Sequence, residues 1–107
     1  MSEVRVVLCT FPDAAEARQI GTVLVEKQHA ACVNLLPAVE SIYRWESKVE
    51  RGSEALAIIK TSTDQLAALE AALTQLHPYE VPEFVALDPA HVAEPYARWV
   101  LGSVSSE

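Results

Sequence analysis

The side chains that could take part in chemistry are two cysteines, three histidines and a set of glutamates. Cys9 and Cys32 lie in apolar stretches without the Cys-x-x-Cys spacing of redox or zinc sites, so each is expected to be a thiol and no structural disulfide is expected. A thiolate together with an imidazole suits a soft or borderline metal such as copper, but two such residues far apart in sequence do not by themselves make a closed site. No catalytic set of side chains is visible.

The histidines each have a structural alternative to metal binding. His77 precedes Pro78 at the end of a leucine-rich segment, where an imidazole can contact the last carbonyl groups of a helix. His29 ends the first expected helix in the same way. His91 lies in an expected loop near the acidic Asp88, where we expect it to be solvated.

Four glutamates could line a cleft between subunits as ligands of a hard cation: Glu46, Glu50, Glu80 and Glu83. The alternative is a solvated face, because charges on strand edges commonly protect a sheet from aggregation. Tyr79 follows the stop of a helix and could close a pocket near that cleft, or form only a capped loop.

The composition limits the class of protein. The chain has 107 residues, of which 50% are hydrophobic and 21% charged, and this predicts one globular domain over residues 1–107. The formal net charge of -7 makes nucleic acid an unsuitable partner, because a polyanion would be repelled. The apolar runs are too short to cross a bilayer, and Met1-Ser2-Glu3 has no secretory signal pattern, so no membrane contact and a cytoplasmic location are expected.

The elements that must position these residues begin with a β-branched, apolar strand over residues 4–10. Asp13, with Glu16 three residues later, predicts the start of a helix that ends near His29. Residues 31–36 read as a second strand, which Pro37 is expected to stop.

Further along, Ser62 to Gln65 resembles a capping box before a helix with leucines at helical spacing, and His77-Pro78 ends that helix. A last strand is expected over residues 81–87, and a short helix with Pro95 in its first turn.

The stretch from Val39 to Val49 alternates between two faces over an unusual length, and we expect it to form a hairpin with residues 55–61 through a turn at Gly52 and Ser53. Eleven residues reach roughly 36 Å and the first strand only about 23 Å, so the hairpin should project beyond its own sheet. It would carry Tyr43 and Trp45, which bury large areas at interfaces, and another copy of the chain is the simplest partner. A bulged hairpin folded back on its own subunit is the alternative.

The order of elements is β-α-β-β-α-β with one appended helix. This order is typical of the α+β ferredoxin-like fold, an antiparallel sheet with two helices on one face. Several segments then match a known family, in the same order and from the first strand to the last helix: Val7-Leu8-Cys9-Thr10, Ala30-Ala31-Cys32-Val33-Asn34, Tyr43-Arg44-Trp45-Glu46, Ile59-Lys60-Thr61 and His77-Pro78-Tyr79-Glu80-Val81-Pro82-Glu83.

On these segments the chain resembles the CutA family of divalent-cation tolerance proteins. The resemblance implies a homotrimer whose long hairpins pair between subunits, a cytoplasmic location, and a role in tolerance of copper (Cu²⁺) or another divalent metal. It also implies that Cys9 and His77 occupy the positions of the family's proposed copper ligands. Family members with two adjacent histidines have the first at the position of Leu76, so this chain lacks one possible ligand.

Other functions remain as alternatives. A PII-like trimer could sense a small anionic ligand at subunit clefts, with Arg44, Lys48 or Lys60 as counter-charges. An acylphosphatase-like enzyme would need a phosphate cradle after the first strand, but the loop there, residues 11–13, contains a carboxylate and no glycine. RNA binding on the sheet is disfavoured, because the first and third strands lack closely spaced aromatic residues and the net charge has the wrong sign.

Overall fold

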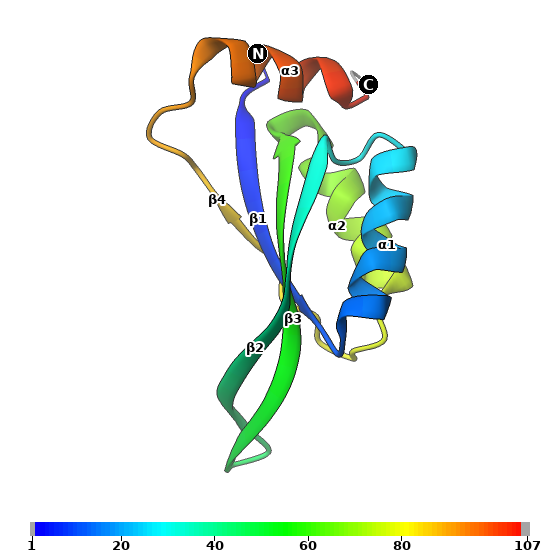
Figure 1. Ribbon diagram of the computed structural model, residues 1–107, viewed down its shortest axis with the longest axis vertical. Coiled ribbons are helices and arrows are strands. Elements are labelled where there is room, and N and C mark those ends of the chain that lie inside the picture. The colour runs from blue at the N-terminus through cyan, green and yellow to red at the C-terminus, as the bar shows by residue number, and fades with distance from the viewer. Residues whose placement is uncertain (1, 106–107) are drawn as a thin grey trace.

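A computed structural model describes residues 2–105 of the chain (Figure 1). Its elements, in chain order, are β1 (Val4–Phe11), α1 (Ala14–Glu26), β2 (Cys32–Trp45), β3 (Lys48–Ser62), a 3₁₀ turn (Thr63–Gln65), α2 (Leu66–Leu76), β4 (Val85–Leu87) and α3 (Glu94–Ser103). The strands form one antiparallel sheet in the order β2-β3-β1-β4. This arrangement confirms the ferredoxin-like α+β fold with a long central hairpin and an additional C-terminal helix.

Helices α1 and α2 pack on the same face of the sheet (Figure 1). The start of α1 is capped as expected, because Asp13 Oδ1 accepts a hydrogen bond of 2.8 Å from the Glu16 amide. Gly21 allows α1 to approach β2 closely, since a Cβ at that position would lie 3.3 Å from Val33 Cγ1. The main core consists of buried side chains from β1, β3 and the two helices: Val7, Cys9, Phe11, Ala17, Ile20, Leu24, Ala55, Ala57, Ile59, Leu69 and Leu73.

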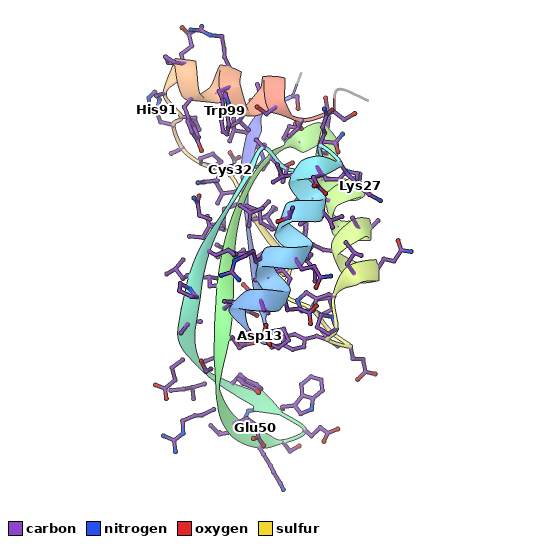
Figure 2. All side chains as sticks on the ribbon, turned by 45° about the vertical axis from the view of Figure 1, so that its right-hand side comes forward. Asp13, Lys27, Cys32, Glu50, His91 and Trp99 are labelled. Carbon is purple, nitrogen blue, oxygen red and sulfur yellow. The ribbon has the colours of Figure 1, made fainter. Side chains whose placement is uncertain are left out.

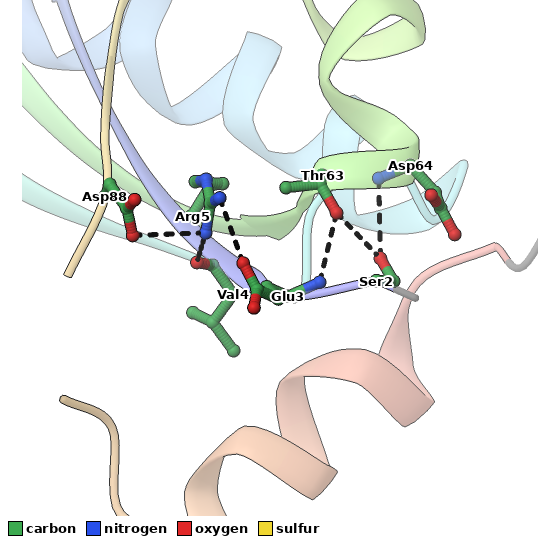
Figure 3. Close-up of polar contacts among 7 residues, drawn as sticks. All are labelled: Ser2, Glu3, Val4, Arg5, Thr63, Asp64 and Asp88. Carbon is green, nitrogen blue, oxygen red and sulfur yellow. Dashed lines mark hydrogen bonds and ion pairs between the residues drawn. The ribbon is translucent and has the colours of Figure 1, made fainter. Parts of the chain in front are cut away.

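Helix α3 lies across one end of the sheet and closes a second, smaller core of Val4, Ala31, Val100 and Val104. Polar contacts fix the start of β1 at the same end. Arg5 pairs with Glu3 at 3.1 Å and with Asp88, which follows β4, at 3.4 Å (Figure 3). These contacts tie the start of β1 to the segment that follows β4.

The largest departure from the sequence-based expectations is that Pro37 does not end the second strand. β2 continues through it to Trp45, and the register shifts between Leu36, opposite Leu56, and Val39, opposite Glu54. Three residues of β2 therefore advance against two of β3, which is a β-bulge. As an edge strand, β2 tolerates a proline, because the missing N–H can face away from the sheet.

The bulge decides which way the hairpin side chains face. Before it, Leu35 pairs with Ala57 on the helix-covered face. After it, Tyr43 pairs with Glu50, and the odd-numbered residues of β2 share the face of the even-numbered residues of β3. Tyr43 and Trp45 therefore lie on the face of the sheet that the helices leave open.

The hairpin turn also lies elsewhere than expected. Glu46 and Ser47 form it, with φ angles of 51° and 69°, and Gly52 lies inside β3 opposite Ser41. Left-handed conformations at both turn positions match the right-handed twist of the flanking strands, and this geometry outweighs the usual preference for glycine there. The turn predicted at Gly52 and Ser53 is wrong.

Two further expectations need correction. The last strand covers only Val85–Leu87, because residues 81–84 form a loop that carries Pro82. The segment from Ser62 does not act as a capping box: a 3₁₀ turn precedes α2 and no side chain caps it. Ser62 is instead the last residue of β3, and its hydroxyl is buried without a hydrogen-bond partner among residues 2–105.

The hairpin projects from the domain as expected. Residues of β3 before Ala55 have no partner in β1 and pair only with β2. The radius of gyration is 14.2 Å, compared with about 13 Å for a compact domain of this length. The molecule is elongated because a two-stranded ribbon extends beyond its two layers (Figure 1).

Candidate functional site

Cys9 and His77, the two residues expected to bind metal, meet at one backbone oxygen. The Thr10 carbonyl accepts a hydrogen bond from His77 Nε2 at 2.7 Å and a weak one from the Cys9 thiol at 3.7 Å. Strand β1 supplies Cys9 and the carbonyl, and the end of α2 brings His77 over them. The fold therefore places these two residues beside the same backbone oxygen.

The imidazole of His77 uses both of its nitrogens. Nδ1 accepts a hydrogen bond of 3.1 Å from the Tyr79 amide, so Nε2 carries the proton that goes to Thr10. The ring is 7% exposed and stacks on Phe11 with the ring centroids 4.7 Å apart. The His77 imidazole therefore joins the end of α2 to β1, while its backbone N–H bonds the Leu73 carbonyl of its own helix at 2.8 Å.

The Cys9 thiol is fully buried in the main core. Burial raises the pKa of Cys9 from an ordinary 9.0 to about 12, with smaller contributions from the negative charges of Glu83 and Glu54. The thiol is therefore protonated at neutral pH. A metal ligand must present a lone pair, and here both the thiol and the imidazole Nε2 present hydrogens to a carbonyl, so the pair as arranged does not fit a bound metal ion.

No three side chains of the metal-binding types gather into a cation site anywhere in residues 2–105. Leu76, at the position where some family members carry a second histidine, is the last residue of α2 and is 42% exposed. It adds no donor atom next to His77.

A groove on the open face lies beside the contact of Cys9 and His77 with Thr10. It has a volume of about 650 Å³ and runs between the hairpin and the loop that follows α2. The hairpin, the end of β1 and that loop line it with the residues Thr10, Ser41, Ile42, Tyr43, Trp45, Glu54, Tyr79, Glu80, Val81, Pro82 and Glu83. Three aromatic rings and three carboxylates therefore surround one space.

Two of these carboxylates are held by hydrogen bonds. Tyr79 donates its hydroxyl to Glu54 Oε2 at 2.6 Å, and Thr10 donates to Glu83 Oε1 at 3.4 Å. Burial and the bond to Glu54 raise the pKa of Tyr79 well above its usual value, so the phenol stays a donor. These hydrogen bonds orient the carboxylates of Glu54, in β3, and Glu83, in the loop, along the groove.

The structure brings together only part of the glutamate set expected from the sequence. Glu80 and Glu83 line the groove, whereas Glu50 lies at the far end of the hairpin with Glu46 next to it in the turn (Figure 2). Glu54 was not expected in the groove. Alternation along β3 places it on the open face, opposite to the buried Ala55 and Ala57, and the bulge in β2 only decides that Val39 is its partner.

The basic residues considered for an anionic ligand lie outside the groove lining. Lys60 Nζ instead donates a short hydrogen bond to Asn34 Oδ1 and lies 4.0 Å from the half-buried Cys32 Sγ on β2. Both cysteines are free thiols.

No helix within residues 2–105 has the length and apolar character needed to span a membrane.

Comparison with known sequences identifies relatives of this chain. Residues 5–103 match the model of a family described as CutA1 divalent ion tolerance protein. The divalent-cation tolerance protein CutA of Thermus thermophilus is 44% identical over 95 residues, which cover 89% of this chain and 92% of that protein. Mouse Protein CutA is also 44% identical, over 91 residues, but this chain spans only 51% of its length.

Solved structures of CutA1 proteins are also similar to this chain over nearly its whole length. The Cut A1 protein of Thermus thermophilus superposes with a TM-score of 0.91 at 42% identity, covering 98% of this chain and 100% of that one. CutA1 from Oryza sativa superposes with a TM-score of 0.94 at 34% identity, covering 98% and 96%. The likeness extends over the projecting hairpin and the last helix.

Proposed function

The chain belongs to the CutA1 family of divalent ion tolerance proteins, and from this premise we propose that it is a homotrimer that binds divalent metal ions and contributes to tolerance of them. The family match over residues 5–103 is the observation that carries the proposal. We also propose a cytoplasmic location, which suits two free thiols.

Support for a homo-oligomer comes from the open face of the sheet and the hairpin. Ile42 and Val49 are 65% and 66% exposed, and Tyr43 and Trp45 are each 46% exposed. A projecting two-stranded ribbon that exposes large apolar side chains on both of its faces is typical of an interaction surface. In a trimeric ring each copy contacts its two neighbours through two different patches, so another copy can cover this surface.

Copper is the proposed metal, with Cys9 and His77 as the proposed ligands. Binding there must remove the thiol proton and break the bond from His77 to Thr10, so we expect proton release on binding and stronger binding at higher pH. Isothermal titration with Cu(II) and Cu(I) tests this on the wild type, Cys9→Ser and His77→Ala.

Matched controls for that titration are Cys32→Ser and His91→Ala, which change the same residue types elsewhere in the chain. Loss of copper binding only in the Cys9 and His77 variants supports the assignment. Unchanged binding in both removes the two residues from the site, and the family's cation must then bind through other groups.

We propose that the protein acts by binding and not by catalysis. The relatives from Thermus thermophilus and Pectobacterium atrosepticum are named as tolerance proteins. Robust turnover of an acyl phosphate by the purified protein would contradict this part of the proposal.

The second candidate is a PII-like sensor of a small ligand at clefts between subunits. The groove favours it, because a space of about 650 Å³ is in the range of small-molecule sites and adjoins the hairpin proposed to meet other subunits. Its acidic lining does not suit the anionic ligand first considered. Melting-temperature shifts across a panel of metabolites test this candidate, and a panel without shifts counts against it.

A further inference from the structure

We propose that Tyr79 is a positioning residue: its hydrogen bond to Glu54 fixes the angle at which the hairpin leaves the sheet, and so aligns the hairpin with a neighbouring copy. The alignment step rests on the proposed homotrimer and deepens it, because it names the residues that prepare one copy for the next. The inference depends on the place of Glu54 in the sheet, the anchoring of Tyr79 and the length of the hairpin.

Glu54 lies at the base of the hairpin, where pairing with β1 ends. The last pair between β1 and β3 joins Phe11 to Ala55, so Glu54 is the first residue beyond it and pairs only with Val39 of β2. The bulge in β2 ends at this same pair. A bulge bends its strand and interrupts the ladder, and a two-stranded ribbon is marginally stable without further packing. The base of the hairpin is therefore the point at which the ribbon can pivot.

Tyr79 bridges this point from a fixed support. Its hydroxyl donates to Glu54 Oε2 at 2.6 Å, and both side chains are half-buried. Its amide donates to His77 Nδ1 at 3.1 Å, and the centroids of the two rings are 4.8 Å apart. His77 in turn donates to the Thr10 carbonyl and stacks on Phe11, the last residue of β1. Tyr79 therefore connects the end of β1 to the first residue of β3 beyond it.

The length of the hairpin amplifies any change of angle at its base (Figure 1). The turn at Ser47 lies roughly 23 Å beyond Glu54 at about 3.3 Å per strand residue, so a rotation of about 10° at the base displaces the turn by about 4 Å. Tyr43 and Trp45, the aromatic residues proposed to meet another copy, lie toward that turn. Preorganised interfaces keep their backbones within about 1 Å. A brace at Glu54 therefore reduces the order that the hairpin must gain on assembly.

Distances between two spin labels on one copy report the angle of the hairpin. The labels are attached through Arg44→Cys on the exposed hairpin and Glu70→Cys on the exposed side of α2, in a Cys32→Ser chain in which the buried Cys9 stays unlabelled. This chain is refolded with an excess of unlabelled chain, so that each assembly carries one labelled copy. We expect one narrow distance distribution in this parent protein.

Tyr79→Phe removes only the hydroxyl and should broaden or displace the distance distribution, because Glu54 then loses its donor. The matched control is Tyr96→Phe, which removes an exposed hydroxyl from α3 at the other end of the sheet (Figure 1). It should leave the distribution unchanged.

Variants of the acceptor separate the hydrogen bond from the charge of Glu54. Glu54→Gln removes the charge but keeps an oxygen that can accept from Tyr79, so it should retain the narrow distribution. Glu54→Ala removes the acceptor and should act like Tyr79→Phe, and the two substitutions together should add no further broadening. Tyr79→Phe and Glu54→Gln keep the test decisive if Glu54→Ala does not fold.

Light scattering along a guanidinium chloride series measures the consequence for assembly. Each copy of the trimer loses one bond in Tyr79→Phe, so the overall dissociation constant should rise at least about tenfold. Tyr96→Phe should leave this constant unchanged.

An unchanged distance distribution in Tyr79→Phe would overturn the proposal. Equal broadening in Glu54→Gln and Glu54→Ala would also overturn it, since Glu54 would then act through its charge. A broadened distribution with an unchanged dissociation constant would refute the alignment step. A monomeric wild type would refute the homotrimer together with that step, whereas the label distances would still decide whether Tyr79 fixes the angle, so the two failures are distinguishable.

Discussion

His77 donates from Nε2 to Thr10 and accepts at Nδ1 from Tyr79, so its ring holds three parts of the chain together: the end of α2, the end of β1 and the following loop. In the sequence His77 precedes Pro78, and two roles were considered for its side chain: binding a metal ion, or contacting the last carbonyl groups of its helix. The geometry adds a third, because the carbonyl that it binds belongs to a strand distant in sequence. A local pattern could not indicate that partner.

Removing the His77 ring should destabilise the protein. His77→Ala removes the hydrogen bond to the Thr10 carbonyl and opens a space beside Phe11, so we expect the free energy of unfolding to fall by about 2–4 kcal/mol in urea titrations. The control is His91→Ala, which alters an exposed loop and should change stability by less than about 0.5 kcal/mol. Equal effects of the two substitutions would contradict the structural role of His77.

The Cys9 thiol should make the fold sensitive to alkaline pH. Its pKa is about 12 in the folded protein and close to 9.0 in the unfolded chain, so the unfolded state loses the proton first. The contribution is therefore fully present below pH 9.0 and is lost as the pH rises toward 12, by up to about 1 kcal/mol per pH unit. Urea unfolding at pH 8 and 10.5 should show a smaller loss in Cys9→Ala than in the wild type, and identical losses would contradict the raised pKa.

At the scale of the elements, the sequence predicted the order of strands and helices well, because hydrophobic periodicity and the Asp13 cap are local signals. It did not predict where the hairpin bends. Pro37 and Gly52 are residues that usually break strands, yet both lie inside long strands. A bulge on an edge strand accommodates the proline, and only the pairing with β3 reveals it.

The hairpin turn allows a direct test of this correction. Ser47 has a left-handed backbone with φ of 69°, so Ser47→Gly should relieve strain and raise stability by up to about 1 kcal/mol. Gly52 has no positive φ, and an added Cβ meets no atom within 4 Å, so Gly52→Ala should be tolerated within about 0.5 kcal/mol. Thermal unfolding measures both, and a large loss in Gly52→Ala with no gain in Ser47→Gly would restore the turn at Gly52.

Asp13 and Ser62 each lie just before a helical segment, but removing their side chains should have different effects on the free energy of unfolding. Asp13→Ala removes the cap of α1 and should cost about 1 kcal/mol in denaturant unfolding. Ser62→Ala removes a buried hydroxyl that has no partner among residues 2–105, so it should be neutral or slightly stabilising. Comparable losses in both variants would show that Ser62 caps the segment before α2 after all.

At the scale of the whole molecule, the candidate site shows what a single sequence can and cannot predict. Of the residues considered for a cleft or a pocket beside it, Tyr79, Glu80 and Glu83 line the groove, whereas Glu46 and Glu50 do not. Tyr43 and Trp45 share the face of Glu54 only because the bulge in β2 reverses the alternation of that strand. Long-range geometry of this kind depends on pairing between strands, which the residues of one strand do not encode.

We propose that other copies of the chain cover the projecting hairpin and the open face. Tyr43 and Trp45 lie on that open face, while Ile42 and Val49, also on the hairpin, are about two-thirds exposed in one subunit. Replacing Tyr43 and Trp45 together by serine should therefore weaken the assembly, whereas Glu70→Gln on α2 should leave it intact.

Light scattering of the purified protein during size-exclusion chromatography, at micromolar concentration, tests this claim most directly. We predict that the wild type has a mass three times the 11.7 kDa of one chain. The mass should shift toward that of a single chain when Tyr43 and Trp45 are replaced. A wild-type protein that elutes as a stable species of 11.7 kDa would contradict it.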